Sequence, residues 1–209
     1  MKTILTDIDG VVLDWETAFH TWMNHKEHGS VVNQNLYDVG HTYGIARTEA
    51  KARVETFNSS AAIGFLPPLR DSQWWIRRLH EQHGYNFVAV TSLSDDPHAQ
   101  ELRIKNLRKL YGNAFTDFHI LGCGEDKDLV LEELSREYWN CFWIEDKPEN
   151  YDVGERFGFR SILMEHGHNM LWGYDTKAEV AKNWEDVYNK VIQREEIDRA
   201  ISSCTVKSI

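Results

Sequence analysis

Short apolar runs alternate with segments of helical periodicity along most of the chain, a pattern typical of a parallel sheet covered by helices. Five runs that end in polar residues predict core strands at residues 3–7, 87–91, 115–121, 141–145 and 161–164, and most of them are short apolar runs of the kind buried on both faces of a sheet. Apolar positions spaced by three or four residues predict crossover helices at 71–83, 97–111 and 128–138, with Asp71 and Asp128 as N-terminal caps. The charged, periodic stretch 177–201 predicts a closing surface helix.

The interval between the first two predicted strands is far longer than one crossover helix requires. It predicts a cap at residues 15–70 inserted into a core made of residues 1–14 and 71–209. Aromatic residues are scattered through this interval among His and Asn, and it closes with the stiff segment Leu66-Pro67-Pro68-Leu69. An insertion after the first strand lies over the carboxyl ends of the strands, where open α/β folds bind ligands. The cap is therefore expected to contact a substrate.

Composition narrows the class of protein further. The 209 residues fit one medium domain with an inserted subdomain, and 42% hydrophobic and 12% aromatic residues exclude intrinsic disorder. A formal net charge of -10 disfavours long nucleic acid and anionic membrane surfaces as partners. The chain shows no apolar run near the ~20 residues of a membrane span. Cys123, Cys141 and Cys204 are sparse and lack metal-ligand spacing, and the sequence starts directly with a strand, so a cytoplasmic location is expected.

The most informative segment is Asp7-Ile8-Asp9-Gly10, which follows the first apolar strand. Two carboxylates at i and i+2 can face one small volume, where they repel each other unless a cation or a shared proton intervenes. Mg²⁺ relieves such repulsion, because it prefers a few carboxylates together with water and substrate phosphate. A polar turn with two solvated carboxylates would have the same sequence, so this segment alone leaves both interpretations open.

Three later segments place suitable residues at the carboxyl ends of other core strands. Thr91 and Ser92 offer hydroxyls and amides for phosphoryl oxygens, Lys127 can neutralise a phosphoryl group, and Asp146 can complete a metal site. Taken singly, each is more often a cap, a surface lysine or an acidic turn. Their occurrence in this order at successive strand ends favours the functional interpretation.

This order resembles the haloacid dehalogenase (HAD) superfamily of phosphotransferases, in which Asp-x-Asp, Thr or Ser, Lys and an acidic pair occur at successive strand ends. The resemblance covers nearly the whole chain. Within the superfamily the sequence is most similar to the 5'(3')-deoxyribonucleotidases, although residues 17–56 of the cap match poorly. The matching segments are Asp7-Ile8-Asp9-Gly10-Val11, Asp14-Trp15-Glu16, Phe65-Leu66-Pro67-Pro68-Leu69, Val90-Thr91-Ser92, Lys109-Leu110-Tyr111-Gly112, Asp126-Lys127, Ile144-Glu145-Asp146-Lys147-Pro148, His168-Asn169 and Asn183-Trp184.

The resemblance implies a HAD-like Rossmannoid α/β fold: a three-layer core with a five-stranded parallel sheet and a small, mainly helical cap. It also implies a phosphoric monoester hydrolase of the nucleotidase type. Asp7 would attack phosphorus to give an aspartyl-phosphate, and Asp9 would protonate the leaving oxygen and then activate water. Thr91, Ser92 and Lys127 would bind the phosphoryl group.

The resemblance further implies Mg²⁺ as cofactor, held by the Asp7 side chain, the Asp9 backbone carbonyl and Asp146. Trp15 falls where the nucleotidases place a ring against the base, and Phe19 is assigned to the same substrate-binding region. The implied partner is a small phosphate ester, such as a deoxyribonucleoside monophosphate, and a homodimer is possible.

Two positions depart from the family pattern. Glu145 stands where the nucleotidases usually carry Asp, which leaves open whether it binds metal, and Glu125 stands where some members carry a basic residue. His166 and His168 are interpreted as structural. The alternative functions are a phosphatase of a sugar phosphate or another small metabolite, and a non-catalytic binding protein on the same scaffold. A polynucleotide-end phosphatase is disfavoured by the acidic charge.

Overall fold

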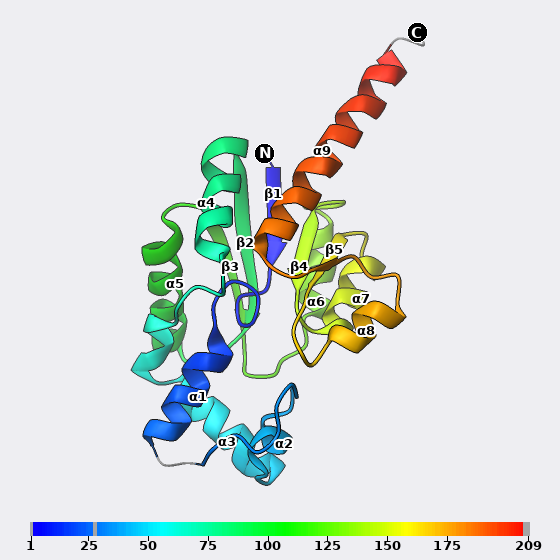
Figure 1. Cartoon of the computed structure of the whole chain (residues 1–209). Helices are drawn as coiled ribbons and strands as arrows, with labels where there is room; N and C mark the ends of the chain where they lie inside the picture. Colours follow the sequence, from blue (N-terminus) through cyan, green and yellow to red (C-terminus); the bar gives the residue numbers. More distant parts are fainter. Residues whose placement is uncertain (1, 27–28, 207–209) are drawn as a thin grey trace.

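The computed structural model describes residues 2–26 and 29–206, with side chains up to residue 203. Within these residues, six strands form one parallel sheet in the order β3-β2-β1-β4-β5-β6 (Figure 1). The strands are β1 Lys2–Thr6, β2 Tyr85–Ser92, β3 Phe115–Leu121, β4 Phe142–Glu145, β5 Arg160–Met164 and β6 Val180–Ala181. β1 lies next to both β2 and β4, so residues just beyond its carboxyl end can meet residues from both neighbours.

Helices cover both faces of the sheet. Successive side chains of a strand point to opposite faces, and in the central strands the residues on both faces are apolar. Ile4 packs in the cluster that includes residues of α4 Ser72–His83, α5 Pro97–Tyr111 and α9 Trp184–Val206. Leu5 points the other way, into the cluster with residues of α6 Asp128–Ser135 and α7 Pro148–Arg156. The α/β class and the three-layer core predicted from the sequence are confirmed.

The long interval after β1 forms α1 Trp15–His25, α2 Val39–Tyr43, α3 Arg47–Asn58 and the 3₁₀ helix η1 Ala61–Phe65. Helices α1, α2 and α3 lie together at one end of the sheet (Figure 1). Fully or nearly fully buried rings of Phe19 and Phe57 pack between α1 and α3. The division into a core and a cap at residues 15–70 stays a prediction, and residues 1, 27–28 and 207–209 of those ranges lie outside the described residues.

The prediction of five strands and of a final helix from residue 177 was wrong in detail. Val180 and Ala181 pair with Leu163 and Met164 of β5 and form a sixth strand. Helix α9 begins only at Trp184. A two-residue strand has no periodicity of its own, so the sequence pattern does not separate it from the helix that follows.

Asp71 occupies the N-cap position of α4 as predicted, although its side chain makes no capping hydrogen bond there, whereas the cap predicted at Asp128 was wrong. Asp71 precedes α4, but its carboxylate accepts the backbone N–H groups of Trp184 and Glu185 at 2.9 and 3.0 Å, so it fixes the start of α9. Lys127 occupies the cap position of α6, and Asp128 lies within the first turn, where it pairs with Arg156. In both cases the carboxylate that was expected to cap its own helix binds a group distant in sequence instead.

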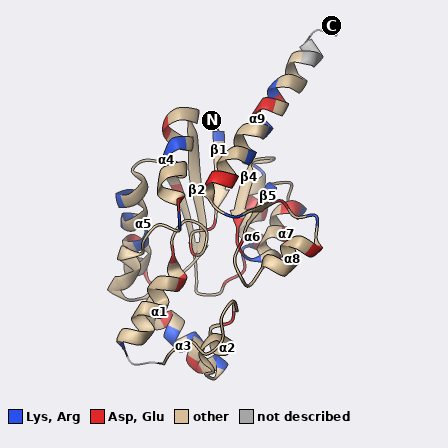
Figure 2. Cartoon of the chain, in the orientation of Figure 1, with Lys and Arg blue, Asp and Glu red and all other residues tan. Residues whose placement is uncertain are grey.

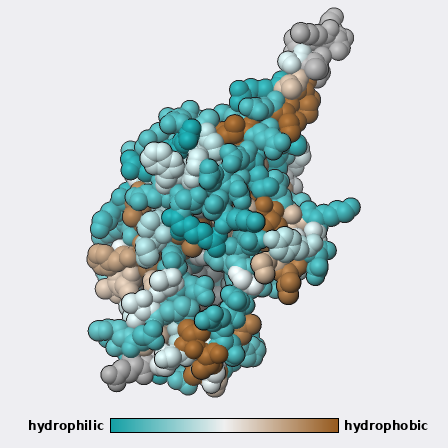
Figure 3. Space-filling model, in the orientation of Figure 1, coloured by the Kyte–Doolittle hydropathy of each residue, from teal (hydrophilic) through white to brown (hydrophobic). Residues whose placement is uncertain are grey.

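Helix α9 is anchored at its start and projects from the body toward its end (Figure 1). Trp184, Val187 and Val191 are fully buried, whereas Ile197 and Ile201 are exposed. Figure 3 shows apolar surface along this outer part of the helix. Among the described residues, no helix combines the length and apolarity needed to cross a bilayer.

Gly154 tests how tightly α7 packs on the sheet. A Cβ atom at this position would lie 2.4 Å from Cδ1 of Trp143 and 2.5 Å from Oγ of Ser161. Alanine normally stabilises a helix relative to glycine, but here overpacking reverses the sign. We expect Gly154→Ala to lower the free energy of unfolding by about 1–3 kcal/mol in urea denaturation. Asp152→Ala on the exposed face of the same helix is the control, with little change; a stabilised Gly154→Ala protein would contradict the packing.

Candidate active site

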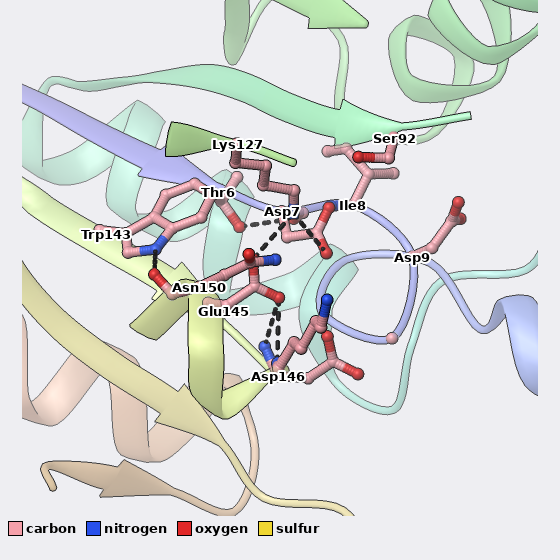
Figure 4. A network of polar contacts seen from close by, with 12 residues as sticks. Thr6, Asp7, Ile8, Asp9, Ser92, Lys127, Trp143, Glu145, Asp146 and Asn150 are labelled. Carbon is pink, nitrogen blue, oxygen red and sulfur yellow. Dashed lines mark hydrogen bonds and ion pairs between the residues drawn. The ribbon is translucent and has the colours of Figure 1, made fainter. Parts of the chain in front are cut away.

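Asp7 follows β1, and the register of the sheet brings it beside the end of β4. Thr6 pairs with Ile144, and the Asp7 N–H donates to the Ile144 carbonyl at 2.9 Å. Glu145 and Asp146 are the next two residues after Ile144, so three carboxylates gather at one point (Figure 4). All three residues are buried, with at most 8% of their surface exposed.

Lys127 lies between two of these carboxylates (Figure 4). It comes from the loop between β3 and α6, is 3% exposed, and places its Nζ 2.9 Å from Asp7 Oδ2 and 2.8 Å from Glu145 Oε2. Burial alone would lower the pKa of Lys127, but the two carboxylates outweigh burial and raise the pKa above its ordinary value. The lysine therefore stays cationic at this site.

Glu145 is already fully engaged within the protein. Its Oε1 accepts the N–H groups of Asp146 and Lys147 at 3.0 and 3.1 Å, and its Oε2 accepts Lys127 and the Asn150 side-chain amide at 2.8 and 3.1 Å. Four donors fill the usual acceptor directions of a carboxylate. Glu145 is thus built to orient Lys127, which gives a physical reason for its departure from the family pattern.

Asp7 and Asp146 remain as the carboxylates best placed for a cation. Ligand oxygens of Asp7, Glu145 and Asp146 lie within 4.8 Å of one another. Burial, followed by the nearby Glu145 carboxylate, raises the pKa of Asp7 to about 7. Burial, followed by Asp7, raises the pKa of Asp146 to about 7 as well. A divalent cation would remove this penalty, so the donor set fits Mg²⁺.

Gly10 is required by the approach of the loop to Asp146. Its φ is +78°, and a Cβ atom would lie 2.6 Å from Asp146 Oδ2. The buried side chain of Asn169 donates to the Asp146 carbonyl at 2.6 Å and to the Met164 carbonyl at 2.9 Å. His166 Nε2 bonds the Gly10 carbonyl, in agreement with the structural interpretation of that histidine. These contacts fix the Asp146 loop against the Asp7 loop.

Thr91, near the end of β2, lines a pocket together with Asp7 and Lys127. Thr91 is 1% exposed, and its hydroxyl has no hydrogen-bond partner among the described residues, although buried hydroxyls are nearly always bonded. Ser92 differs, because its hydroxyl donates to the Glu125 carbonyl at 2.8 Å. The Glu125 carboxylate turns back to the Gly122 N–H at 2.9 Å. Thr91 is the better placed of the two hydroxyls to bind a ligand.

The Asp9 carboxylate points away from this acidic group (Figure 4). Its Oδ1 lies 2.6 Å from Nη1 of Arg103, a fully buried residue of α5. Arg103 was not among the predicted site residues, because the periodicity of residues 97–111 indicates only a crossover helix. The available signal was a cation within the apolar stripe of that helix, four residues from both Ala99 and Leu107, which are buried.

A pocket of about 520 Å³ extends from this end of the sheet toward α1–α3. Asp7, Thr91 and Lys127 line its inner wall, and Trp15 and Tyr43 belong to its outer wall. The indole N–H of Trp15 donates to Asn58 Oδ1 at 2.9 Å, and its ring stacks on Phe19 with centroids 4.6 Å apart. Phe19 is 1% exposed, so its surface toward the pocket is small. The site roles predicted for these residues stay predictions.

Lys and Arg residues and Asp and Glu residues are both scattered over the elements outside the site (Figure 2). The buried acidic group at the carboxyl edge of the sheet is therefore a local feature and not part of a uniformly acidic face. This group holds the carboxylates of Asp7, Glu145 and Asp146 and the buried cation Lys127, whereas the Asp9 carboxylate pairs separately with the buried Arg103.

The chain has the HAD-like fold. It is similar to a HAD-like hydrolase from Streptococcus pneumoniae with a TM-score of 0.63 at 12% identity, over 91% of this chain and 98% of the other. It is also similar to D,D-heptose 1,7-bisphosphate phosphatase from B. bronchiseptica complexed with magnesium and phosphate, with a TM-score of 0.59 at 14% identity over 93% and 99%. A third similar structure is the L-2-haloacid dehalogenase of Xanthobacter autotrophicus, with a TM-score of 0.56 at 11% identity over 91% and 98%. At these identities the likeness shows the fold alone.

Among curated proteins, the chain is 28% identical over 210 residues to an uncharacterized 32.4 kDa protein of Enterobacteria phage T4, from the Gp30-rIII intergenic region. The similarity covers 96% of this chain and 73% of the phage protein. No protein-family model matches the chain. The haloacid dehalogenase fold expected from the strand-end residues is confirmed.

The raised pKa values predict how the metal-free protein responds to pH. The folded state holds the protons of Asp7 and Asp146 more tightly than the unfolded chain does. Their contribution to the free energy of unfolding is therefore complete below pH 3.8 and is lost as the pH rises through about 7. We expect Asp146→Asn to raise the melting temperature in EDTA at pH 8, by about 4 °C or more, and to change it much less at pH 4.

Mg²⁺ gives the companion measurement on the same proteins. It should raise the melting temperature of the wild type more at pH 8 than at pH 5, because ionised carboxylates bind it better. Asp146→Asn should remove most of this response, whereas Asp152→Asn on the protein surface should retain it. An equal response to Mg²⁺ in wild type and Asp146→Asn would contradict a metal site at Asp146.

Proposed function

We propose that the protein is a Mg²⁺-dependent phosphomonoesterase that acts on a small nucleotide, a deoxyribonucleoside monophosphate, through an aspartyl-phosphate. The observation that carries the proposal is the buried ion pair of Asp7 and Lys127 beside Asp146. The unbonded hydroxyl of Thr91 in the same pocket adds a donor for a phosphoryl oxygen. The confirmed fold is shared with phosphatases, one of them complexed with magnesium and phosphate.

In this mechanism an Asp7 oxygen attacks phosphorus while the bond from phosphorus to the ester oxygen breaks. Asp9 gives its proton to that leaving oxygen, then accepts a proton from the water that hydrolyses the aspartyl-phosphate and restores Asp7. Lys127 and Thr91 hold phosphoryl oxygens, and Lys127 opposes the rise in the pKa of Asp7 and so favours its ionised form. The Asp7 and Asp146 side chains and the Asp9 backbone carbonyl would hold Mg²⁺, which supplies positive charge between the nucleophile and the phosphoryl group.

Charge favours a metal-assisted reaction on an anionic substrate. The four carboxylates and two cations of the site leave it net negative when all are ionised. A phosphate ester brings further negative charge, and at close range such repulsion is large in a buried site. A divalent cation makes the two compatible, and the raised pKa values of Asp7 and Asp146 mark where it is needed.

The nucleotide is proposed from the sequence resemblance to the deoxyribonucleotidases and from the pocket. The pocket is large enough for a sugar and a base, and Trp15 lines it together with the proposed nucleophile Asp7. The heptose bisphosphate phosphatases among the structural relatives keep a sugar phosphate as the alternative. A non-catalytic role is disfavoured by the assembled nucleophile, cation and hydroxyl.

Asp7→Asn tests the chemistry. The amide is nearly isosteric but does not form the acyl phosphate, so turnover should fall by at least about 1000-fold while the protein stays folded. Phosphate release from a panel of nucleoside monophosphates and sugar phosphates, with Mg²⁺ or with EDTA, is the measurement. Asp152→Asn is the control. Activity of Asp7→Asn close to wild type would refute the proposed nucleophile, and sugar phosphates preferred over nucleotides would replace the proposed substrate.

Trp15→Ala tests the base contact. Aromatic stacking on a base is worth about 1–3 kcal/mol, so kcat/KM for a nucleoside monophosphate should fall by about 5- to 150-fold, and a phosphate ester without a base should change much less. Trp15→Phe should retain most of the activity, and Trp74→Ala, at an exposed position of α4, should match wild type. Parallel losses on both esters, with an earlier melting transition, would show that Trp15 only packs α1 against α3.

A further inference from the structure

Arg103 is a buried cation that has no role in the mechanism proposed above. It is fully buried on α5, in a stripe that also holds Ala99, Leu107 and Tyr111. An apolar residue would fill this position without the desolvation of a charge. Its Nη1 lies 2.6 Å from Asp9 Oδ1, while its Nε and Nη2 have no hydrogen-bond partner among the described residues. Packing alone gives no reason for a guanidinium here.

Asp9 and Arg103 differ in their access to the pocket. Asp9 lines the pocket and its side chain is 20% exposed, whereas Arg103 is absent from the pocket wall and its side chain is wholly enclosed. The guanidinium therefore touches Asp9 from behind and cannot reach a substrate in the pocket. Only Oδ1 of Asp9 is held, and the Arg103 bond is the only hydrogen bond or ion pair assigned to the carboxylate within residues 2–26 and 29–206.

We propose that Arg103 is a positioning residue that fixes one oxygen of Asp9, so that the other oxygen is presented to the leaving group of the substrate. The inference rests on the phosphomonoesterase function proposed above. In the first step the proton on the free oxygen of Asp9 passes to the ester oxygen as its bond to phosphorus breaks and Asp7 bonds to phosphorus. Without the guanidinium the carboxylate rotates freely, and fewer substrate complexes have it aligned.

The dependence on leaving group separates this role from a structural one. An alkoxide, as released from a nucleoside 5'-monophosphate, needs a proton as it departs, whereas 4-nitrophenolate needs little help. We expect Arg103→Met to lower kcat on the nucleotide by about 100-fold or more, the lower range of general-acid contributions. On 4-nitrophenyl phosphate the loss should be no more than about fivefold. Equal losses on both esters, or no loss on either, overturn the proposal.

Arg103→Met is a workable variant, because methionine fills much of the same volume and Asp9 keeps access to water from the pocket. Its melting temperature is measured alongside. Arg103→Lys is the second variant: it keeps the charge, and we expect a smaller loss with the same bias against the poor leaving group. Arg108→Met, at an exposed position of α5, is the matched control and should behave as wild type. An unbiased loss in Arg103→Lys overturns the proposal even where Arg103→Met does not fold.

Asp9→Asn shows whether Arg103 acts through Asp9. If it does, Arg103→Met should lower kcat on the nucleotide no further once Asp9→Asn is present. A further loss of tenfold or more in the double variant assigns Arg103 another role and overturns the proposal. A wild type that releases no phosphate from any ester in Mg²⁺ overturns the function itself, and with it this inference. An active wild type with unbiased variants overturns the Arg103 role alone.

Discussion

The arrangement of the site depends on one interaction, the ion pair in which Lys127 lies between Asp7 and Glu145. Three buried carboxylates at adjacent strand ends would repel one another strongly, and burial already disfavours their charged forms. Lys127 compensates part of this charge at 2.8–2.9 Å from two of them. Glu145 in turn is held by two backbone N–H groups and a side-chain amide of the segment that follows β4. The position of the Lys127 ammonium group therefore depends on that segment as well as on the loop that carries Lys127. One lysine does not balance three carboxylates. Burial and this excess of negative charge keep the pKa values of Asp7 and Asp146 raised, and the arrangement suits a cation.

The sheet order explains why these groups meet. β1 lies between β2 and β4, and Asp7 directly follows β1, so the carboxyl ends of both neighbouring strands lie beside it and residues remote in sequence converge at one edge of the sheet. The loop after Asp7 then has to pass close to Asp146, which only glycine allows at position 10. The same loop leads directly into α1, and the aromatic residues of α1 and α3 form the outer side of the pocket. Asp7, the proposed nucleophile, and Trp15 of the pocket wall thus lie on one continuous segment of chain, so the packing of Trp15 and the placement of Asp7 are linked.

The sequence predicted those parts of the structure that depend on local pattern. The strand at 115–121 and the helix at 97–111 have the predicted bounds, because a short run with strand-forming residues and an amphipathic helix are both visible in the local sequence. Asp7, Lys127 and Asp146 were found because strand ends of a parallel sheet meet at one edge. Features set by a distant partner were not found: the carboxylate of Asp71 caps α9 instead of α4, Val180 and Ala181 form a strand through β5, and Arg103 is explained only by Asp9. Pattern along the chain carries no information on which remote group takes a polar side chain.

The two aspartates of the Asp-x-Asp segment end in different environments, although they are two residues apart. Asp7 is paired with Lys127, which precedes α6 on one face of the sheet, and Asp9 is paired with Arg103, from α5 on the other face. Two cations from opposite layers therefore draw the carboxylates apart, and neither lysine nor arginine can serve both. Asp7 is the more enclosed of the two, with a 12% exposed side chain against 20% for Asp9. An enclosed carboxylate beside a cation suits attack on phosphorus, and a more accessible one suits exchange of protons with a leaving group and water. In the proposed mechanism, the different roles of the two aspartates therefore follow from which helix layer supplies the cation that pairs with each of them.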